Sequence, residues 1–550
     1  MPINLAIRGM SACQLACNKL NTTAVDHLSK VVKMTEVVFL FELHQPRRFK
    51  RQLGRSSQND MPGLAEEIYF DDKLNRDVLD RVAMRAYLPA LKSIARSIKE
   101  DGFRCALGIS GVLMEQCMWW NPKILELVRD LVKTGACELV AQPYFRTLAS
   151  VFDLEEMAEQ VEAHRKALNT AFGVNPTIAG NTDFIYNNKM AKKFASMGFK
   201  AVLTEGVESA LSWRSPNHVY NARDSGIPLL MRNGMLSDDI GFRYSAADWS
   251  EWPLTPEKYS DWLSKVDGDV IFIALDLAAF GEHHLFESGI NNFLSSLPKE
   301  ISKHGKLSFA TPSEVVGTHA SVGEIDVDES ATISWADHQK DTSAWLGNDM
   351  QRYCLDVARY MQPVAKKLGG KYLRMWRLLT TSDHFYYMNA KGEEARGAGA
   401  YFSPYNSAIE AFLTFNWVLS DYRQRLYGSA GDNISYYRML DGRLPAGHLF
   451  RFYSGFTRPE GSTARNLREL LDAIKVMDAK VLEFNVIRGD LSRWVGEVLG
   501  CSALSLWLDS LRQKGLPDEI KEAMAAEVER AIMEAESRLG KMEKDSLETR

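Results

Sequence analysis

The chain has 550 residues, which is enough for two or three domains with complete hydrophobic cores. Its 66 basic and 71 acidic residues give a formal charge of -5, and the lack of a basic block argues against a nucleic-acid partner. No apolar run approaches the roughly 18 to 20 residues needed to cross a bilayer, so we expect no membrane partner and no membrane anchor.

The segment 1–33 contains neither a convincing strand or helix nor the uninterrupted apolar core of a signal peptide. We predict a leader over residues 1–33 that is either disordered or the product of a mis-called start, with Met34 as the other candidate start. Seven scattered cysteines are typical of a reducing compartment and predict a cytoplasmic protein. Cys13 and Cys17 are close in sequence, but no second pair of Cys or His completes a zinc site.

Short apolar runs that end in polar residues recur along residues 34–315, which we predict to form one domain. Segments with helical spacing of apolar residues lie between them, for example 124–132 and 157–171. The alternation of strand and helix predicts an all-parallel α/β sheet, closed or open, and a closed barrel would gather the polar groups at one face. The predicted strands are 37–43, 105–110, 138–141, 177–182, 201–204 and 270–276.

Carboxylates stand at the ends of several of these runs, and two of them are the strongest catalytic candidates. Asp276 ends the run 270–276, and Asp183 follows the run 177–182. An acid at the carboxyl end of a barrel strand is typical of a catalytic group. The alternative is an acid that caps the helix or loop after the strand, and this alternative applies with more force to Glu205 after the run 201–204.

Beyond Pro312 the alternation of strand and helix stops. We predict an aromatic-rich helical subdomain over 316–430 that completes a cleft, and a small α/β domain over 440–505 with strands at 448–454 and 481–488. Residues 506–550 are predicted to form a charged C-terminal helix, either solvated or involved in a homo-oligomer. One stripe of that helix is apolar and contains Ile520, Met524 and Val528.

Asp183 and Asp276 with flanking aromatic residues are the groups that cleave a glycosidic bond, and this chemistry needs no cofactor. One acid protonates the leaving oxygen, the other attacks the anomeric carbon, and aromatic faces hold sugar rings. A metal site is the competing use of the same residue types, in which His44, Asp183 and His283 would bind a divalent ion. The spacing alone leaves both alternatives open.

Five segments resemble, in order, the sequence blocks of glycoside hydrolase family 57, and most of all those of its archaeal α-amylase-like branch. The resemblance extends over about residues 34–425. The segments are Phe41-Glu42-Leu43-His44-Gln45-Pro46, 110–116, 181–188, 276–283 and 381–388.

The resemblance implies an incomplete barrel of seven parallel strand-helix units with an attached helical bundle, a small appended C-terminal domain, and retaining cleavage or transfer of α-glucans or maltooligosaccharides. It places Asp276 on the general acid/base and Asp183 on the nucleophile, which is normally Glu. Residues expected to contact substrate are His44, Gln45, Glu115, Trp213, His283 and His384.

Several positions depart from the pattern of this branch. Asp183 is one methylene shorter than Glu, Arg146 stands where the branch usually has His, and apolar residues 277–279 follow Asp276 in place of polar ones. Residues 397–400 replace an acid and a His. These departures favour a second hypothesis, a catalytically impaired glucan-binding or regulatory relative, beside the first one of an active hydrolase or glucanotransferase and a third one of a metal-dependent hydrolase on a related barrel. The first hypothesis loses support if Arg146 or Phe280 fills the space between the two carboxyls.

Overall fold

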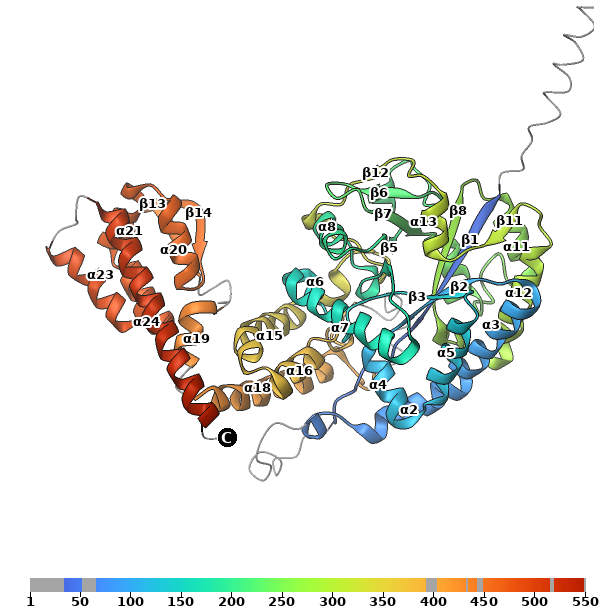
Figure 1. The fold of residues 1–550 in the computed structure, drawn as a ribbon, viewed down its shortest axis with the longest axis horizontal. Helices are drawn as coiled ribbons and strands as arrows, with labels where there is room; N and C mark the ends of the chain where they lie inside the picture. The colour runs from blue at the N-terminus through green and yellow to red at the C-terminus, as the bar shows by residue number, and fades with distance from the viewer. Residues whose placement is uncertain are drawn as a thin grey trace, which may run out of the picture.

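The computed structural model describes residues 34–51, 66–391, 403–431, 434–442, 449–514 and 519–548. Figure 1 shows three parts in a row: the barrel, a helical subdomain beside it, and a C-terminal unit beyond helix α18. The predicted leader over 1–33 and the replaced segment 397–400 lie outside the described residues.

A ring of parallel strands forms the barrel. Strand β1 pairs with β2 and β8, β2 with β3, β4 with β5, and β7 with β5 and β8. A bridge between Ala141 and Ala179 joins β3 to β4 and closes the ring. The predicted parallel α/β architecture is therefore confirmed, in its closed form. The strands are β1 (Thr35–Leu43), β2 (Cys105–Ile109), β3 (Cys137–Leu139), β4 (Ile178–Ala179), β5 (Ala201–Glu205), β7 (Pro228–Arg232) and β8 (Val270–Asp276).

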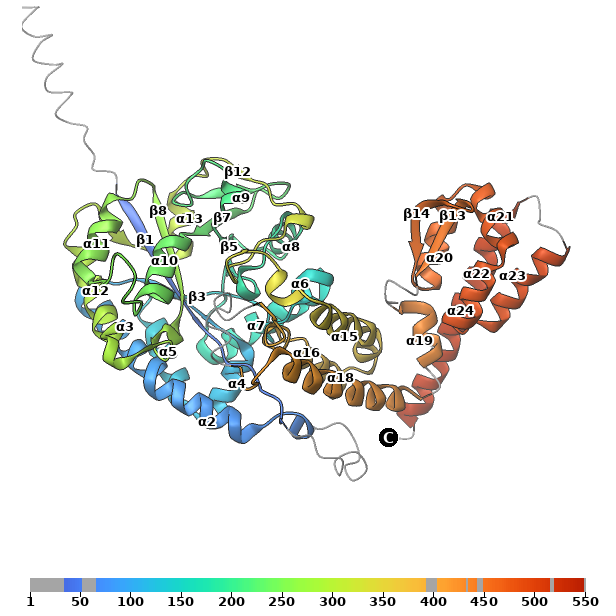
Figure 2. The same cartoon turned by 180° about the vertical axis from the view of Figure 1, so that it is seen from behind.

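Side chains of β1 alternate between the inside of the barrel and the surrounding helices, as the two-residue period of a strand requires. Val38 and Leu40 pack with Ala274 in the cluster that fills the barrel. Phe39 and Phe41 pack outward against the helix layer. Figures 1 and 2 show this layer around the strands. It contains α2 (Asp72–Val82), α3 (Leu88–Asp101), α4 (Gly111–Trp120), α5 (Lys123–Lys133), α7 (Leu154–Phe172), α8 (Asn188–Ser196), α11 (Pro256–Lys265), α12 (Ile290–Ser302) and α13 (Pro312–Thr318).

The sequence patterns missed β7 because it is short, begins at Pro228 and ends at Arg232. It forms a hairpin with the antiparallel strand β6. The remaining short elements lie at the edges of the sheet or in the loops. They are β6 (Tyr220–Ala222), β9 (Phe280–Gly281), β10 (His284–Leu285), β11 (Leu307–Phe309), β12 (Glu324–Ile325), α6 (Ala149–Phe152), α9 (Glu208–Leu211) and α10 (Gly234–Asp238).

The helical subdomain is attached to the loop after β3. The N–H of Ser382 donates to the carbonyl of Arg146 at 2.9 Å, and the N–H of Leu148 donates to the carbonyl of Thr380 at 3.2 Å. These bonds bring the start of α17 to the mouth of the barrel. The subdomain contains α14 (Ser343–Leu346), α15 (Asp349–Leu368), α16 (Gly370–Leu379), α17 (Ser382–Tyr386) and α18 (Ala408–Ala430).

One predicted strand of the C-terminal unit is wrong, because 481–488 belongs to helix α21. A short apolar run does not distinguish the two structures, and here the buried residues recur at helical spacing. From α21 the side chain of Asn485 bonds both the N–H and the carbonyl of Tyr453 in β13. The unit contains α19 (Ile434–Asp441), β13 (Phe450–Gly455), β14 (Arg458–Ala464), α20 (Leu467–Val476), α21 (Ala479–Arg488), α22 (Asp490–Arg493), α23 (Ser502–Lys514) and α24 (Ile520–Glu548).

Residues 506–550 do not form the single helix that we predicted. They include the end of α23 and then α24, and the sequence between these helices contains Gly515 and Pro517, both unfavourable in helix interiors. The apolar stripe of α24 is buried inside the chain, where α24 packs against α19 and α20. It is therefore not available to a second copy.

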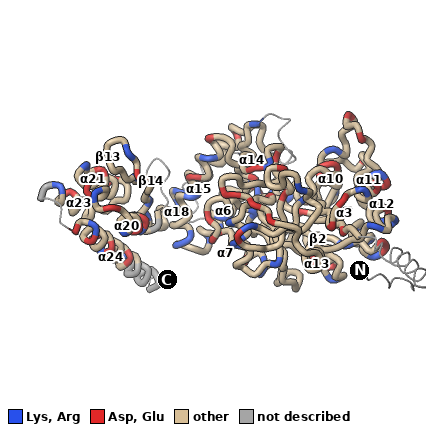
Figure 3. The backbone as a smooth tube through the Cα atoms, turned by 90° about the horizontal axis from the view of Figure 1, so that it is seen from above, with Lys and Arg blue, Asp and Glu red and all other residues tan. Residues whose placement is uncertain are grey.

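Charges are mixed over the surface: Figure 3 shows Lys and Arg interspersed with Asp and Glu along the tube. Among the helices of the described ranges, none combines the length and the apolar character of a membrane span.

Candidate active site

A cavity of about 170 Å³ lies at the carboxyl ends of the barrel strands. Its wall includes five of the predicted site residues, which come from the ends of three barrel strands, β1, β4 and β8, and the loops that follow them. Loop 335–337 and helix α17 complete the wall on the side of the helical subdomain. The predicted residues in the cavity are His44, Gln45, Asp183, Asp276 and His283.

Asp276 is the last residue of β8 and the cap of the short helix η6 (Leu277–Ala279). Its Oδ1 accepts a hydrogen bond from the N–H of Ala278 at 2.8 Å. Burial raises the pKa of the Asp276 carboxyl to about 6, although the hydrogen bond from the Ala278 N–H acts to lower it. A carboxyl that keeps its proton in weakly acidic solution is suited to general acid catalysis. The apolar residues 277–279 that replace polar ones are buried in packing.

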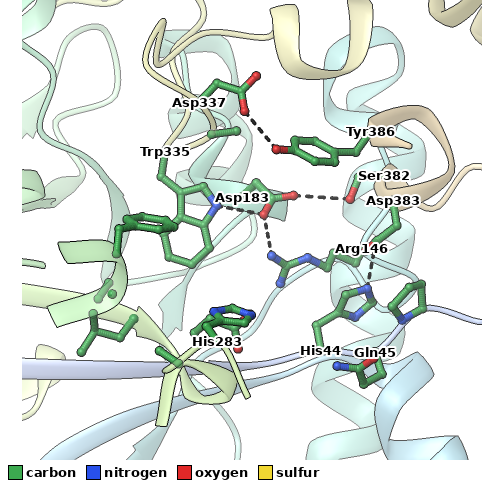
Figure 4. A pocket seen from close by; sticks show the side chains of 18 of the residues that line it. His44, Gln45, Arg146, Asp183, His283, Trp335, Asp337, Ser382, Asp383 and Tyr386 are labelled. Atoms are coloured by element: carbon green, nitrogen blue, oxygen red, sulfur yellow. Dashed lines mark hydrogen bonds and ion pairs between the residues drawn. The ribbon is translucent and has the colours of Figure 1, made fainter. Parts of the chain in front are cut away.

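Asp183 lies in the short helix η4 (Thr182–Phe184) with a backbone φ of 49°. Its Oδ1 accepts hydrogen bonds from Arg146 Nη2 at 2.5 Å and from Trp335 Nε1 at 2.9 Å, and its Oδ2 accepts one from Ser382 Oγ at 3.4 Å. Figure 4 shows these donors around the carboxylate. Because non-glycine residues rarely adopt positive φ, this conformation is typical of a functional constraint.

Arg146 is the residue that the sequence departures singled out, and it does contact the predicted nucleophile. It follows β3, has a φ of 50°, and points its guanidinium at Asp183. Its Nη1 also lies 3.7 Å from Glu42 Oε2. Phe280, the other residue suspected of filling the cavity, packs edge-on against Phe41 in the core.

Glu42 is a buried carboxyl near the cavity that the sequence patterns did not identify. Burial raises the pKa of Glu42 to about 7; Arg146 opposes this shift, and Asp183 and Asp276 add to it. The available signal was a single charged residue inside the apolar run 37–43.

His44 is held by a hydrogen bond at each ring nitrogen. Its Nδ1 lies 2.7 Å from Ser110 Oγ and its Nε2 lies 3.0 Å from Asp383 Oδ2. Burial lowers the pKa of His44, against the attraction of Asp383. Burial alone would raise the pKa of Asp383, but His44 and Arg146 outweigh burial and hold it well below its usual range. We therefore assign a ring that donates from Nε2 to an ionised Asp383.

Asp337 closes the wall opposite His44. Its Oδ1 accepts from the Tyr386 hydroxyl at 3.1 Å and its Oδ2 accepts from Asn389 Nδ2 at 3.0 Å. Trp335 from the same loop packs edge-on against Phe184 at 4.9 Å. The sequence patterns did not single out this loop, because nothing local shows that it reaches the barrel mouth.

Three predicted substrate contacts are not brought to the cavity. The Glu115 carboxylate forms an ion pair with Arg374 at 2.7 Å and accepts a hydrogen bond from the Tyr144 hydroxyl at 2.8 Å. His384 is stacked on Phe49 with ring centroids 4.1 Å apart. The Trp213 residue is 91% exposed on the surface.

Glu205, the alternative carboxylate, binds Arg232 at 3.0 Å. That ion pair is buried, so Glu205 has a structural partner of its own.

Two of the side chains proposed as metal ligands already make other contacts. Asp183 binds Arg146, and His44 binds Ser110 and Asp383. Within the described ranges, no group of three or more His, Cys, Asp or Glu side chains is arranged to hold a metal ion.

Comparison with known proteins gives a family and a relative. Residues 38–328 match the model of "Glycosyl hydrolase family 57". A protein of Methanocaldococcus jannaschii that bears the provisional name alpha-amylase is 42% identical over 396 residues, which cover 70% of this chain and 84% of that protein.

Two solved structures are more distant. The 4-alpha-glucanotransferase from Thermococcus litoralis has 17% identity and a TM-score of 0.45, and the match covers 64% of this chain and only 50% of that one. The GH57-type branching enzyme from Pyrococcus horikoshii has 13% identity and a TM-score of 0.49, over 74% of this chain and 89% of that one.

Proposed function

The chain belongs to glycoside hydrolase family 57, and on that premise we propose that it cleaves or transfers α-glucan chains by a retaining mechanism with Asp276 as the acid/base and Asp183 as the nucleophile. The observation that carries this proposal is the pairing of unlike carboxyls in one cavity. Asp276 is in a setting that keeps its proton, whereas Asp183 accepts hydrogen bonds from Arg146 and Trp335. Two carboxyls in different environments are the usual basis for separate acid and nucleophile roles.

In the first step, the protonated Asp276 gives its proton to the glycosidic oxygen while the bond from that oxygen to the anomeric carbon breaks. The Asp183 carboxylate forms a bond to the anomeric carbon from the opposite side. The leaving chain departs with a new hydroxyl group, and Asp276 is left as a carboxylate.

In the second step, the Asp276 carboxylate takes a proton from a water molecule. The water oxygen bonds to the anomeric carbon, and the ester bond to Asp183 breaks, which restores both side chains. If the hydroxyl of a second glucan replaces the water, the same step transfers the chain.

Arg146 acts on the charge of Asp183 during these steps. Its ion pair with Asp183 stabilises the carboxylate before attack, and the ester that forms carries no charge. Glu42 lies at 3.7 Å from the same guanidinium, so Arg146 keeps a carboxyl partner while Asp183 is esterified.

The test is release of products from maltooligosaccharides and glycogen by the purified protein. We expect Asp276→Asn and Asp183→Asn each to reduce kcat by about a thousandfold or more, as the loss of such groups does in other enzymes. Asp130→Asn, a matched change on the outer helix α5, should leave kcat unchanged. Full activity in Asp276→Asn would contradict the assignment.

A second candidate function is favoured by the Arg146–Asp183 ion pair at 2.5 Å. A carboxylate bound this tightly is a weaker nucleophile, and Asp is shorter than the usual Glu by about 1.5 Å of reach at most. The protein would then bind glucan without cutting it. Glycogen binding without product release, followed by gain of product release in Asp183→Glu or Arg146→His, would favour this function over the first.

We also propose that the protein works in the cytoplasm. The cysteines of the described residues are free thiols in buried positions, which suits a reducing compartment. The five are Cys105, Cys117, Cys137, Cys354 and Cys501.

A further inference from the structure

The strand register places Glu42 directly beside Asp276. In the pairing of β1 with β8, Glu42 is the partner of Asp276, and in the pairing of β1 with β2 it is the partner of Gly108. Partners in register on parallel strands direct their side chains to the same face. That face is the inside of the barrel, because Leu40 and Ala274, two residues earlier on each strand, belong to the cluster that fills it.

The neighbouring strand leaves room for Glu42. A Cβ on Gly108 would lie 2.3 Å from Glu42 Oε1, so even alanine at position 108 would collide with the carboxyl. Gly108 has no positive φ that would itself require glycine. The glycine is therefore explained by the space that the Glu42 side chain occupies inside the barrel.

The charges around Glu42 are unbalanced. Arg146 is the cation within ion-pair distance, at 3.7 Å, and it makes a closer pair with Asp183. Glu42 Oε2 is buried and has no hydrogen bond of normal geometry within the described part of the chain, although the Gln142 side chain acts on the carboxyl and lowers its pKa. One guanidinium thus serves two carboxyls, and Asp276 is a third one nearby.

We propose that Glu42 is a positioning residue of the active site, which acts through Asp276 because its carboxyl occupies the buried position beside that acid inside the barrel. This inference rests on the proposed function, since it gives Asp276 the role of the acid. Two carboxyls that share one poorly solvated place do not both ionise easily, and the last proton belongs to the pair rather than to either residue. Glu42 therefore extends the pH range in which Asp276 can donate.

Other charged groups face the pair from each neighbouring element. Arg146 favours the ionised form of both carboxyls, and His44 favours that of Asp276. Asp183 opposes ionisation of both. Tyr87, from the helix layer, lies close enough for Asp276 to raise the pKa of its hydroxyl.

The first test compares pH profiles of kcat/KM for the wild type and Glu42→Gln. We expect the decline of kcat/KM at high pH to begin about one pH unit lower in the variant, because Asp276 no longer shares a proton with Glu42. KM at pH 5 should stay within twofold. Glu42→Asp keeps a carboxyl, so its decline at high pH should begin between those of Glu42→Gln and the wild type. Glu36→Gln, on the same strand at the other end of the barrel, is the matched control. Coincident profiles for Glu42→Gln and the wild type would overturn the proposal.

The second test does not depend on activity, so it separates failure of this inference from failure of the proposed function. Melting temperatures are measured at pH 5 and pH 8 for Glu42→Gln, Asp276→Asn and the double variant. We expect Glu42→Gln to raise the melting temperature at pH 8 relative to pH 5, and Asp276→Asn to remove most of that gain, since contacting groups are not additive. An equal gain with and without Asp276 would show that the two carboxyls are independent and would overturn the proposal.

Discussion

Arginines lie among carboxylates both at the barrel mouth and in a cluster between the barrel and the helical subdomain, and these two places differ in how the charges are matched. The seam cluster, between the barrel and the helical subdomain, consists of Arg47, Glu66, Asp72, Glu115 and Arg374. Arg374 binds both Glu66 and Glu115, and Arg47 binds both Glu66 and Asp72. Each carboxylate therefore has at least one guanidinium within close contact.

At the barrel mouth, one guanidinium serves a larger share of the negative charge. Arg146 pairs with Asp183 and, less closely, with Glu42. Among the described residues, Asp276 accepts a hydrogen bond only from the backbone N–H of Ala278. The pKa of Glu42 and that of Asp276 are raised there, chiefly by burial. Matched charge is typical of a structural network, whereas a surplus of buried carboxyls is costly and marks the place where chemistry is expected.

The largest effect should come from removing Arg146. Arg146→Met leaves Asp183 and Glu42 buried without a cation, and breaking such a buried pair costs about 4 kcal/mol in the free energy of unfolding at pH 8. Urea unfolding at pH 8 and pH 5 measures this loss, which should shrink at pH 5 as Glu42 takes a proton.

Arg374→Met in the seam cluster is the matched comparison. Arg374 is partly exposed, so water replaces some of the lost contact and we expect about 1 kcal/mol. A larger loss for Arg374→Met than for Arg146→Met would break the distinction between the two clusters.

The next-largest effect concerns His384, which lies on helix α17 but does not line the cavity. Burial lowers the pKa of His384 to about 4. Its ordinary value is near 6.5, so the unfolded chain binds the proton first as the pH falls. Stability should therefore fall from pH 6.5 to pH 4, and His384 should contribute about 3 kcal/mol of that fall.

His384→Phe keeps a ring against Phe49 and removes the titrating group. We expect its stability to decrease less than that of the wild type over the same pH window, as measured by urea unfolding at several pH values. Parallel stability curves for the two proteins would mean that the folded and the unfolded chain bind a proton at His384 equally well, and that burial does not lower its pKa.

Glu115 tests whether the seam cluster has a part in substrate binding. Glu115→Gln removes the charge that Arg374 and the Tyr144 hydroxyl contact. Because Arg374 is partly exposed and keeps its pair with Glu66, we expect a loss of about 1 kcal/mol in stability. KM for maltooligosaccharides should stay within twofold of the wild type. A rise in KM at unchanged stability would instead mean that Glu115 contributes to substrate binding.

The sequence predicted the part of the site that depends on strand ends. Asp183, Asp276 and His44 each follow an apolar run, and the carboxyl ends of parallel strands meet at one face whatever the details of the loops. The same rule placed Gln45 in the cavity wall, beside His44.

The sequence did not predict what depends on orientation and register. Asp383 and His384 are neighbours on one short helix, and only the packing of that helix decides that Asp383 faces His44 while His384 faces Phe49. Glu42 became informative only when the register showed Asp276 and Gly108 beside it. For 481–488, a short apolar run was compatible with strand and helix alike.

The smallest effect should come from Trp213, which is 91% exposed and lies outside both charged regions. Because its removal uncovers no core, Trp213→Ala should change the free energy of unfolding by less than about 0.5 kcal/mol. The matched variant is Trp119→Ala, since the Trp119 ring lies 5.4 Å from the guanidinium of Arg47 in the seam cluster. Removing that ring should cost about 1 kcal/mol.

Substrate length then decides whether Trp213 belongs to the function at all. Sugar contacts confined to the barrel mouth predict equal KM values for Trp213→Ala and the wild type, with short maltooligosaccharides and with glycogen. A KM that rises for glycogen alone would mean that long chains extend over the surface to Trp213, because an exposed indole face can stack on a sugar ring without any contribution to folding. The mouth would then be one end of a longer binding surface, and the contrast between mouth and seam would apply only to the groups around the bond that is broken.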